Sequence, residues 1–196
     1  MSVELLDQLS QPALVVAPHL LGALLRRRSP EGVVGVRITE VEAYSGDGTD
    51  PAAHTHRGRT RRNEVMFGPA GSLYVYFSYG MHWCANVVCG PTGTGEAVLL
   101  RAGQVVEGLD LARRRRLAAR RDVDLARGPA RLTQALGITG ADNGAHLLDR
   151  RGRLSIRLAT DPPAADRIQV GPRIGIAKAT ALPWRFWLEN DPTVSR

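Results

Sequence analysis

The clearest pattern in the chain is the alternation of apolar and polar residues in "VVGVRITEVEAY", residues 33–44. Alternation across a β-branched segment predicts a strand, because successive side chains of a strand point to opposite faces. On an unbroken strand, one face carries these residues: Val34, Val36, Ile38, Glu40 and Glu42. That face begins apolar and ends in two carboxylates, so we expect its far end to meet something other than a dry core.

Other periodic segments complete the outline of the fold. Residues 12–28 begin as an apolar helix and pass into a strand near Ala23, and helices are expected at 105–121 and 128–138, the second with Pro129 at its first position. Further strands are expected at 72–80, 82–89, 96–102, 152–159 and, once or twice, within 167–190. Strands outnumber helices and mostly follow one another through short connections, which predicts an α+β fold with antiparallel pairing.

Size and composition narrow the class of protein. At 196 residues, with 43% hydrophobic and 23% charged residues, the sequence is typical of a single globular domain over residues 1–196. No apolar run approaches the roughly 20 residues needed to span a bilayer. The stretch "MSVELLDQLSQ" also lacks the basic start and apolar centre of a secretion signal. We therefore expect a cytoplasmic protein that does not enter membranes.

The net charge of +7 indicates a polyanionic partner. Arginine supplies all but one of the 26 basic residues, which codon bias in a GC-rich genome would also produce. The acid-free run "RRRRLAARR" is explained equally well by a solvated face and by a partner. A second run lies in the long connection 45–71, where "HTHRGRTRRN" carries Arg57, Arg59 and Arg61. Long loops inside compact domains are usually functional, so we expect these three arginines to contact the polyanion.

Aromatic residues are scarce, at 5% of the chain, yet three of its four tyrosines fall within "YVYFSY". A core strand is one explanation, since tyrosine has good strand propensity. Tyr74 and Tyr76 share one strand face, however, whereas Tyr79 takes the other and precedes Gly80. Aromatic faces beside basic loops are how proteins hold unstacked nucleic-acid bases, at roughly 1–3 kcal/mol per stack.

Three polar residues lie within apolar strands. Glu42 is either a surface residue at a strand end or a positioned general base, and the second explains why a carboxylate stands at a phosphate-binding surface. Arg101, in "VLLRAG", requires a buried partner, for which Glu42, Glu40 and a phosphate are the candidates. Asn86, in "CANVVC", is explained by hydrogen bonding within the core.

His54 and His56, in "AAHTH", suggest a metal-dependent hydrolase that would use Asp47 as a further ligand. Two histidines with no matching third ligand nearby are a weak indication of a metal. We therefore expect neither a metal nor another cofactor, and retained activity in a chelator would remove this alternative.

The string "ITEVEAYSGDGTDPAAHTHRGRTRRNEVMFGPAGSLYVYFSYGMHWCANVV" resembles the alkyladenine, or 3-methyladenine, DNA glycosylases. The likeness continues through "GEAVLLRAGQVVEGL", "RGPARLTQALGI" and "RIGIAKATALPWRFWL", and covers about residues 10–190. The ordered combination of E-A-Y, A-A-H, N-x-x-M-F, L-Y-V-Y-x-x-Y-G-M, N and L-L-R-A is highly specific. The resemblance implies one α+β domain with a curved, mainly antiparallel sheet flanked by helices. It also implies excision of alkylated purines from double-stranded DNA by base flipping.

The resemblance assigns roles to individual positions. Glu42 matches the catalytic base that activates the attacking water, and Arg101 matches the arginine that helps hold this water. Tyr44, His54 and Tyr76 match the residues that sandwich and contact the flipped base.

Three more positions concern the pocket floor and the duplex. Asn86 matches the residue that disfavours normal guanine, and Tyr79 matches the side chain that enters the duplex where the base has left. His82 departs from the family, whose members carry an aromatic residue there. The basic loop with Arg57, Arg59 and Arg61 then becomes a candidate contact with the DNA backbone.

The nucleophile and the alternatives follow from the same residues. The single lysine, Lys178, is far in sequence from Glu42, so we expect a monofunctional enzyme in which water attacks the sugar. A catalytically silent nucleic-acid-binding domain would use the same aromatic and arginine side chains but would not need Glu42 or Arg101. In either case we expect a monomer.

Overall fold

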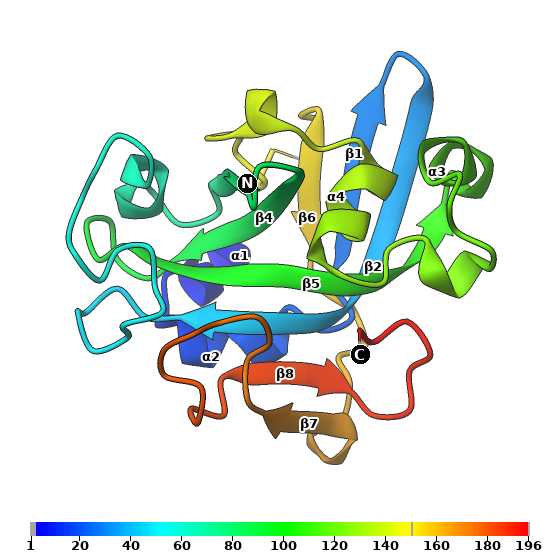
Figure 1. Cartoon of the computed structure of the whole chain (residues 1–196). Coiled ribbons are helices and arrows are strands. Elements are labelled where there is room, and N and C mark those ends of the chain that lie inside the picture. Colours follow the sequence, from blue (N-terminus) through cyan, green and yellow to red (C-terminus); the bar gives the residue numbers. More distant parts are fainter. Residues whose placement is uncertain (1–2, 150, 196) are drawn as a thin grey trace.

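A curled antiparallel β-sheet organises the chain, with helices packed against it (Figure 1). The computed structural model describes residues 3–149 and 151–195. In this part of the chain the sheet has eight strands, in the order β3-β4-β5-β2-β1-β6, while β8 pairs with β2 and β7 pairs with β8. The strands are β1 (Leu24–Ser29), β2 (Gly32–Tyr44), β3 (Leu73–Ser78), β4 (His82–Cys89), β5 (Glu96–Glu107), β6 (Leu154–Arg157), β7 (Ile168–Gly171) and β8 (Arg185–Leu188).

Helices cover the sheet and close the main hydrophobic core. The α-helices are α1 (Val3–Leu9), α2 (Ala13–His19), α3 (Leu109–Arg115) and α4 (Pro129–Leu136), and short 3₁₀ helices lie at Glu64–Phe67, Asp122–Asp124, Gly140–Asp142 and Ala165–Arg167. In Figure 1, α2 lies below β2 and α4 lies above β5. Pro129 begins α4 and Gly137, in the left-handed conformation, ends it, as the residue preferences of helix ends predict. The predicted α+β class with a curved, mainly antiparallel sheet is confirmed.

The long central strand β2 carries the candidate chemistry because its ladder with β5 is irregular. The pairing shifts register twice in this region, between Ile38 and Glu40 and again between Glu40 and Val41. The opposed pairs are Ile38 with Gly103, Glu40 with Ala102, and Val41 with Leu100. Thr39 and Arg101 therefore have no residue opposite them in the ladder. Bulges of this kind bend a strand and redirect side chains. The single face expected from alternation thus ends at Ile38, which packs in the hydrophobic core, and the two glutamates beyond it bind polar partners.

The helix predicted for residues 105–121 is wrong at both ends. Strand β5 continues to Glu107, because Val105 and Glu107 still pair with β2. Gly108 then turns the chain with φ 71°, so close to Val33 that a Cβ atom would stand 1.9 Å from its carbonyl oxygen. Only glycine fits this turn. Helix α3 is therefore limited to Leu109–Arg115.

Candidate active site

A cavity of about 560 Å³ opens beside the end of β2. Its walls come from β3, β4 and β5, from the loop after β2, and from the segment that joins β7 to β8. The cavity brings together six of the residues singled out in the sequence: Tyr44, His54, Tyr76, Tyr79, Asn86 and Arg101. Glu42 lies beneath this surface, without solvent exposure, while Arg57, Arg59 and Arg61 lie outside the cavity lining.

Aromatic side chains form one side of the cavity. The His54 ring packs edge-on against Tyr76, with 4.5 Å between ring centroids, and its Nδ1 lies 3.0 Å from the hydroxyl of Tyr74. Tyr74 in turn stacks on Tyr76 at 5.6 Å. Burial raises the pKa of Tyr76 and of Tyr44, and the Glu42 charge raises both further. Both phenols therefore remain neutral at physiological pH.

Glu42 has three polar partners from three different segments, two hydrogen-bond donors and one ion-pair partner. Its Oε1 accepts from the backbone N–H of Ile174 at 2.7 Å and forms an ion pair with Arg101, whose Nη1 lies 3.1 Å away. Its Oε2 accepts from the hydroxyl of Tyr44 at 2.9 Å. Each carboxylate oxygen offers about two acceptor positions. Oε1 faces both Ile174 and Arg101, whereas Oε2 accepts from Tyr44 alone, so Oε2 keeps a position for one further donor.

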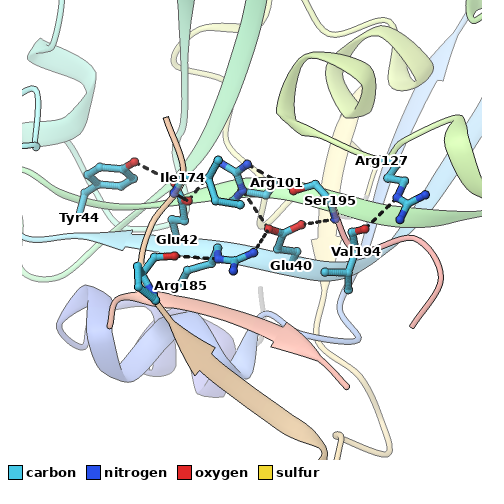
Figure 2. A network of polar contacts seen from close by, with 10 residues as sticks. Glu40, Glu42, Tyr44, Arg101, Arg127, Ile174, Arg185, Val194 and Ser195 are labelled. Carbon is cyan, nitrogen blue, oxygen red and sulfur yellow. Dashed lines mark hydrogen bonds and ion pairs between the residues drawn. The ribbon is translucent and has the colours of Figure 1, made fainter. Parts of the chain in front are cut away.

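Arg101 lies between two buried carboxylates, as Figure 2 shows. Its Nε donates to Glu40 Oε1 at 3.0 Å, and its Nη1 lies 3.1 Å from Glu42 Oε1. Burial disfavours the charge of Arg101, but the two glutamates outweigh this loss of hydration, so the pKa of Arg101 is raised. Of the partners expected for Arg101, the structure provides both carboxylates. The register shift explains why one arginine can reach them both.

Tyr79 stands at the tip of the hairpin that joins β3 and β4. The backbone N–H of Met81 donates to the carbonyl of Ser78 at 3.1 Å, which closes a tight turn with Tyr79 and Gly80 at its centre. Both central residues have positive φ, and Tyr79, at φ 49°, is in a conformation that side chains other than glycine seldom adopt. The Tyr79 side chain is 82% exposed. The turn expected before Gly80 is present, and Tyr79 borders the same cavity as Tyr76 although alternation placed the two on opposite strand faces.

Asn86 fits both explanations that the sequence leaves for it. It pairs with Tyr74 across β3 and β4, and its Nδ2 donates to the Tyr74 carbonyl at 3.1 Å. It also lines the cavity, although it is nearly fully buried. His82, at the start of β4, lies opposite Ser78 and is exposed near the hairpin tip.

The residues that suggested a metal site do not converge. His54 contacts Tyr74, His56 is exposed, and Asp47 accepts hydrogen bonds from the backbone and side chain of Thr49. Within residues 3–149 and 151–195, no group of three or more His, Cys, Asp or Glu side chains is arranged to hold a metal ion. The donor set needed for a metal-dependent hydrolase is therefore not assembled in the described part of the chain.

The two arginine runs differ in their surroundings. Arg57, Arg59 and Arg61 are exposed, and Arg59 has its guanidinium 5.9 Å from the ring centroid of Phe67. The second run is largely occupied within the fold: Arg113 pairs with Asp110 and Asp122, Arg115 with Glu31, and Arg121 with Asp124. The two explanations for the second run were a solvated face and a partner, and these ion pairs leave less of its charge for a partner.

The segment between β7 and β8 contributes a wall of the cavity that the sequence analysis missed. Arg173 anchors it, through two hydrogen bonds to Asp50 at 2.6 and 2.7 Å and one to the Ala43 carbonyl at 2.9 Å. The same guanidinium lies 4.5 Å from the ring centroid of Tyr44. Lys178, expected to be remote, lines the cavity from this segment. An arginine and an acid far apart in sequence gave no local signal of this contact.

Comparison of the sequence with known proteins shows the family of the chain. A model of the methylpurine-DNA glycosylase family matches residues 7–192. Relatives with the provisional name 3-methyladenine DNA glycosylase include one from Streptomyces avermitilis, 52% identical over 95% of this chain and 87% of the relative, and one from Nocardia farcinica, 53% identical over 100% and 92%. A third, from Corynebacterium glutamicum, is 52% identical over 94% and 93%. The chain belongs to the methylpurine-DNA glycosylase family, and is a DNA-repair glycosylase.

Among the described residues, no helix has the length and apolar character needed to cross a membrane.

Proposed function

We propose that this protein is a monofunctional DNA glycosylase that rotates alkylated purines of the 3-methyladenine type out of double-stranded DNA. It then hydrolyses the N-glycosidic bond, as the first step of base excision repair. The observation that carries the proposal is the Glu42–Arg101 pair, with 3.1 Å between Nη1 and Oε1, beneath an aromatic cavity. Membership in the methylpurine-DNA glycosylase family supports the same reaction.

Flipping comes first, because a base stacked in a duplex keeps its sugar carbon out of reach. Extrusion costs a few kcal/mol. Tyr79 offsets part of this cost by filling the gap, and its exposure on a tight turn suits a side chain that must enter the stack. The extruded purine lies among Tyr44, Tyr76 and His54, while Asn86 at the floor disfavours normal guanine.

The enzyme selects damaged bases by the charge of the alkylated purine and by how readily that purine leaves the sugar. An alkylated purine is electron-poor and often cationic, so neutral electron-rich rings bind it better than a normal base. Alkylation also lets the base depart more easily. As the C1′–N bond breaks, its electron pair leaves with the purine and the sugar develops oxocarbenium character.

Water completes the reaction with the help of Glu42 and Arg101. The water takes the free acceptor position on Glu42 Oε2, its oxygen attacks C1′, and its proton passes to the carboxylate. The negative charge of Glu42 also stabilises the oxocarbenium-like sugar. Because Glu42 has no exposed surface, the water enters beside Tyr44, whose hydroxyl already occupies part of Oε2.

The setting of the reaction is part of the proposal. A single glycosylase domain over residues 1–196 acts as a monomer on chromosomal DNA in the cytoplasm. Arg57, Arg59 and Arg61 hold the phosphate backbone beside the cavity.

The decisive experiment is an excision assay on duplexes that each carry one defined lesion: 3-methyladenine, 7-methylguanine, hypoxanthine or an etheno adduct. Excision in the presence of a chelator supports the proposal and removes the metal-dependent hydrolase. Binding of lesion DNA without excision of any base would favour the silent nucleic-acid-binding domain.

A further inference from the structure

A second carboxylate lies beneath the cavity, and the proposed reaction does not use it. Glu40 has no solvent exposure, and it accepts hydrogen bonds from Arg101 and from two groups beside Arg101 (Figure 2). Its Oε1 accepts from Arg101 Nε at 3.0 Å and from Arg185 Nη1 at 3.1 Å. Its Oε2 accepts from the backbone N–H of Ser195 at 2.6 Å.

Ser195 closes the arrangement from a segment that is remote in sequence. Its hydroxyl accepts from Arg101 Nη2 at 3.3 Å, while its N–H holds Glu40. The preceding residues anchor this segment: Thr193 meets Thr39 with 2.8 Å between hydroxyl oxygens, and the Val194 carbonyl accepts from Arg127 Nε at 2.8 Å.

Every nitrogen of the Arg101 guanidinium therefore has a different partner. Nε binds Glu40, Nη1 binds Glu42 and Nη2 binds Ser195. A guanidinium carries five N–H groups in a fixed plane. Two of them donate to Glu40 and Ser195, and those on Nη1, beside Glu42, remain for a water or a sugar oxygen.

We propose that Glu40 and Ser195 are positioning residues, which fix Arg101 so that it faces Glu42 with Nη1 alone, at Oε1, and leaves the acceptor position on Glu42 Oε2 open for the attacking water. This inference rests on the proposed glycosylase reaction. Arginine and carboxylate groups readily form two parallel hydrogen bonds. With Nε held by Glu40, Arg101 cannot turn its fork fully onto Glu42.

Charge explains why the positioning group is a carboxylate. Arg101 and Arg185 bring two positive charges to this region, and Glu40 and Glu42 balance them. A buried ion pair is weak evidence of a purely stabilising role, since apolar residues of similar volume often serve stability equally well. The presence of a carboxylate here is better explained by the orientation of Arg101.

The test is single-turnover excision by Glu40→Gln, alone and combined with Arg101→Gln. Arg101 and Ser195 donate to different oxygens of Glu40. A glutamine replaces one of these oxygens with a donating NH2 group, so it cannot accept at both positions. We expect the excision rate of Glu40→Gln to fall about 100-fold, as expected for a misplacement of about 1 Å, while the affinity for lesion DNA changes less than about threefold. In the Arg101→Gln background, Glu40→Gln should produce no further loss, because it acts through Arg101.

Two further variants keep the test decisive. Ser195→Pro removes the N–H that holds Glu40 from outside the sheet, and replaces Glu40→Gln in the test if that variant does not fold. It should slow excision when Arg101 is present and cause no further loss in the Arg101→Gln background. Asp142→Asn is the matched control, since Asp142 is equally buried, pairs with Arg27 and Arg153, and lines no part of the cavity. It should lower the melting temperature without changing the excision rate of the folded protein.

The outcomes separate this inference from the proposed function. Absence of excision by the wild-type protein would remove both. Wild-type excision with an unchanged rate in Glu40→Gln, or in Ser195→Pro where Glu40→Gln does not fold, would remove only the positioning role. Losses in Glu40→Gln and Arg101→Gln that multiply in the double variant would also overturn it, because they would show that Glu40 acts independently of Arg101.

Discussion

The hydroxyl of Tyr44 donates to Glu42 Oε2 across 2.9 Å, and the two residues lie two positions apart on β2. Side chains with this spacing share one face of a strand. The ring proposed to hold the flipped base therefore touches the carboxylate proposed to activate water. Entry of the base and access of water to Glu42 are consequently coupled through one side chain.

This contact predicts different effects for two substitutions at the same position. Tyr44→Phe keeps the ring and should bind lesion DNA within about threefold of wild type, but excise about tenfold more slowly, because Glu42 loses one charge-assisted hydrogen bond. Tyr44→Ala should also lose about 1–3 kcal/mol of binding through the missing stack. Equal binding by the two variants, measured by titration of a lesion duplex, would mean that the Tyr44 ring does not contact the base.

Tyr79→Ala should weaken binding to duplex DNA and slow flipping, because the exposed side chain at the turn no longer fills the gap in the stack. The loss should be smaller on a substrate whose lesion is already unpaired. Tyr79→Phe is the control, since it keeps the ring. Equal losses on paired and unpaired substrates, in single-turnover assays, would contradict a wedge.

DNA affinity should fall steeply with salt, and the loop arginines should carry part of this dependence. Arg57→Glu, Arg59→Glu and Arg61→Glu should each reduce the slope of log affinity against log salt by about 0.9 for every phosphate that the variant no longer neutralises. Arg113→Glu is the matched control, because Arg113 already pairs with Asp110 and Asp122. Slopes that stay at the wild-type value would place the three loop arginines away from the DNA.

Borohydride should trap no covalent complex between the protein and a lesion duplex. Lys178 lines the cavity, so its amine is nearer the site than its sequence position suggested. It is nevertheless exposed, and the partners of Glu42 are Ile174, Arg101 and Tyr44. Water therefore remains the expected nucleophile. A trapped adduct that disappears in Lys178→Ala would instead make Lys178 the nucleophile and the enzyme bifunctional.

Local pattern predicts those parts of the site that depend on local structure. Alternation identifies β2 and the β3–β4 hairpin, and the need of a buried arginine for a partner points from Arg101 to Glu40 and Glu42. The resemblance to a known family, rather than any pattern, assigns His54 its role. Each of these inferences needs only the sequence close to the residue concerned, or a motif shared with the family.

Long-range pairing decides the rest. The register shifts that leave Arg101 between two carboxylates depend on how β5 meets β2, which no single segment encodes. The Arg173–Asp50 pair joins segments far apart in sequence, and the position of Lys178 follows from it. Local pattern assigned Val105 and Val106 to a helix, although branched side chains favour a strand. Pairing with β2 extends β5 through them to Glu107.

The most direct test of the central claim is single-turnover excision by Glu42→Gln on a lesion duplex that the wild-type protein cleaves. Glu107→Gln is the control, because Glu107 pairs with Arg26 at the other end of β5. The account predicts that Glu42→Gln binds the lesion duplex as tightly as the wild type, or more tightly, and releases no base, while Glu107→Gln remains active. Excision by Glu42→Gln near the wild-type rate would contradict the assignment of Glu42 as the base that activates water.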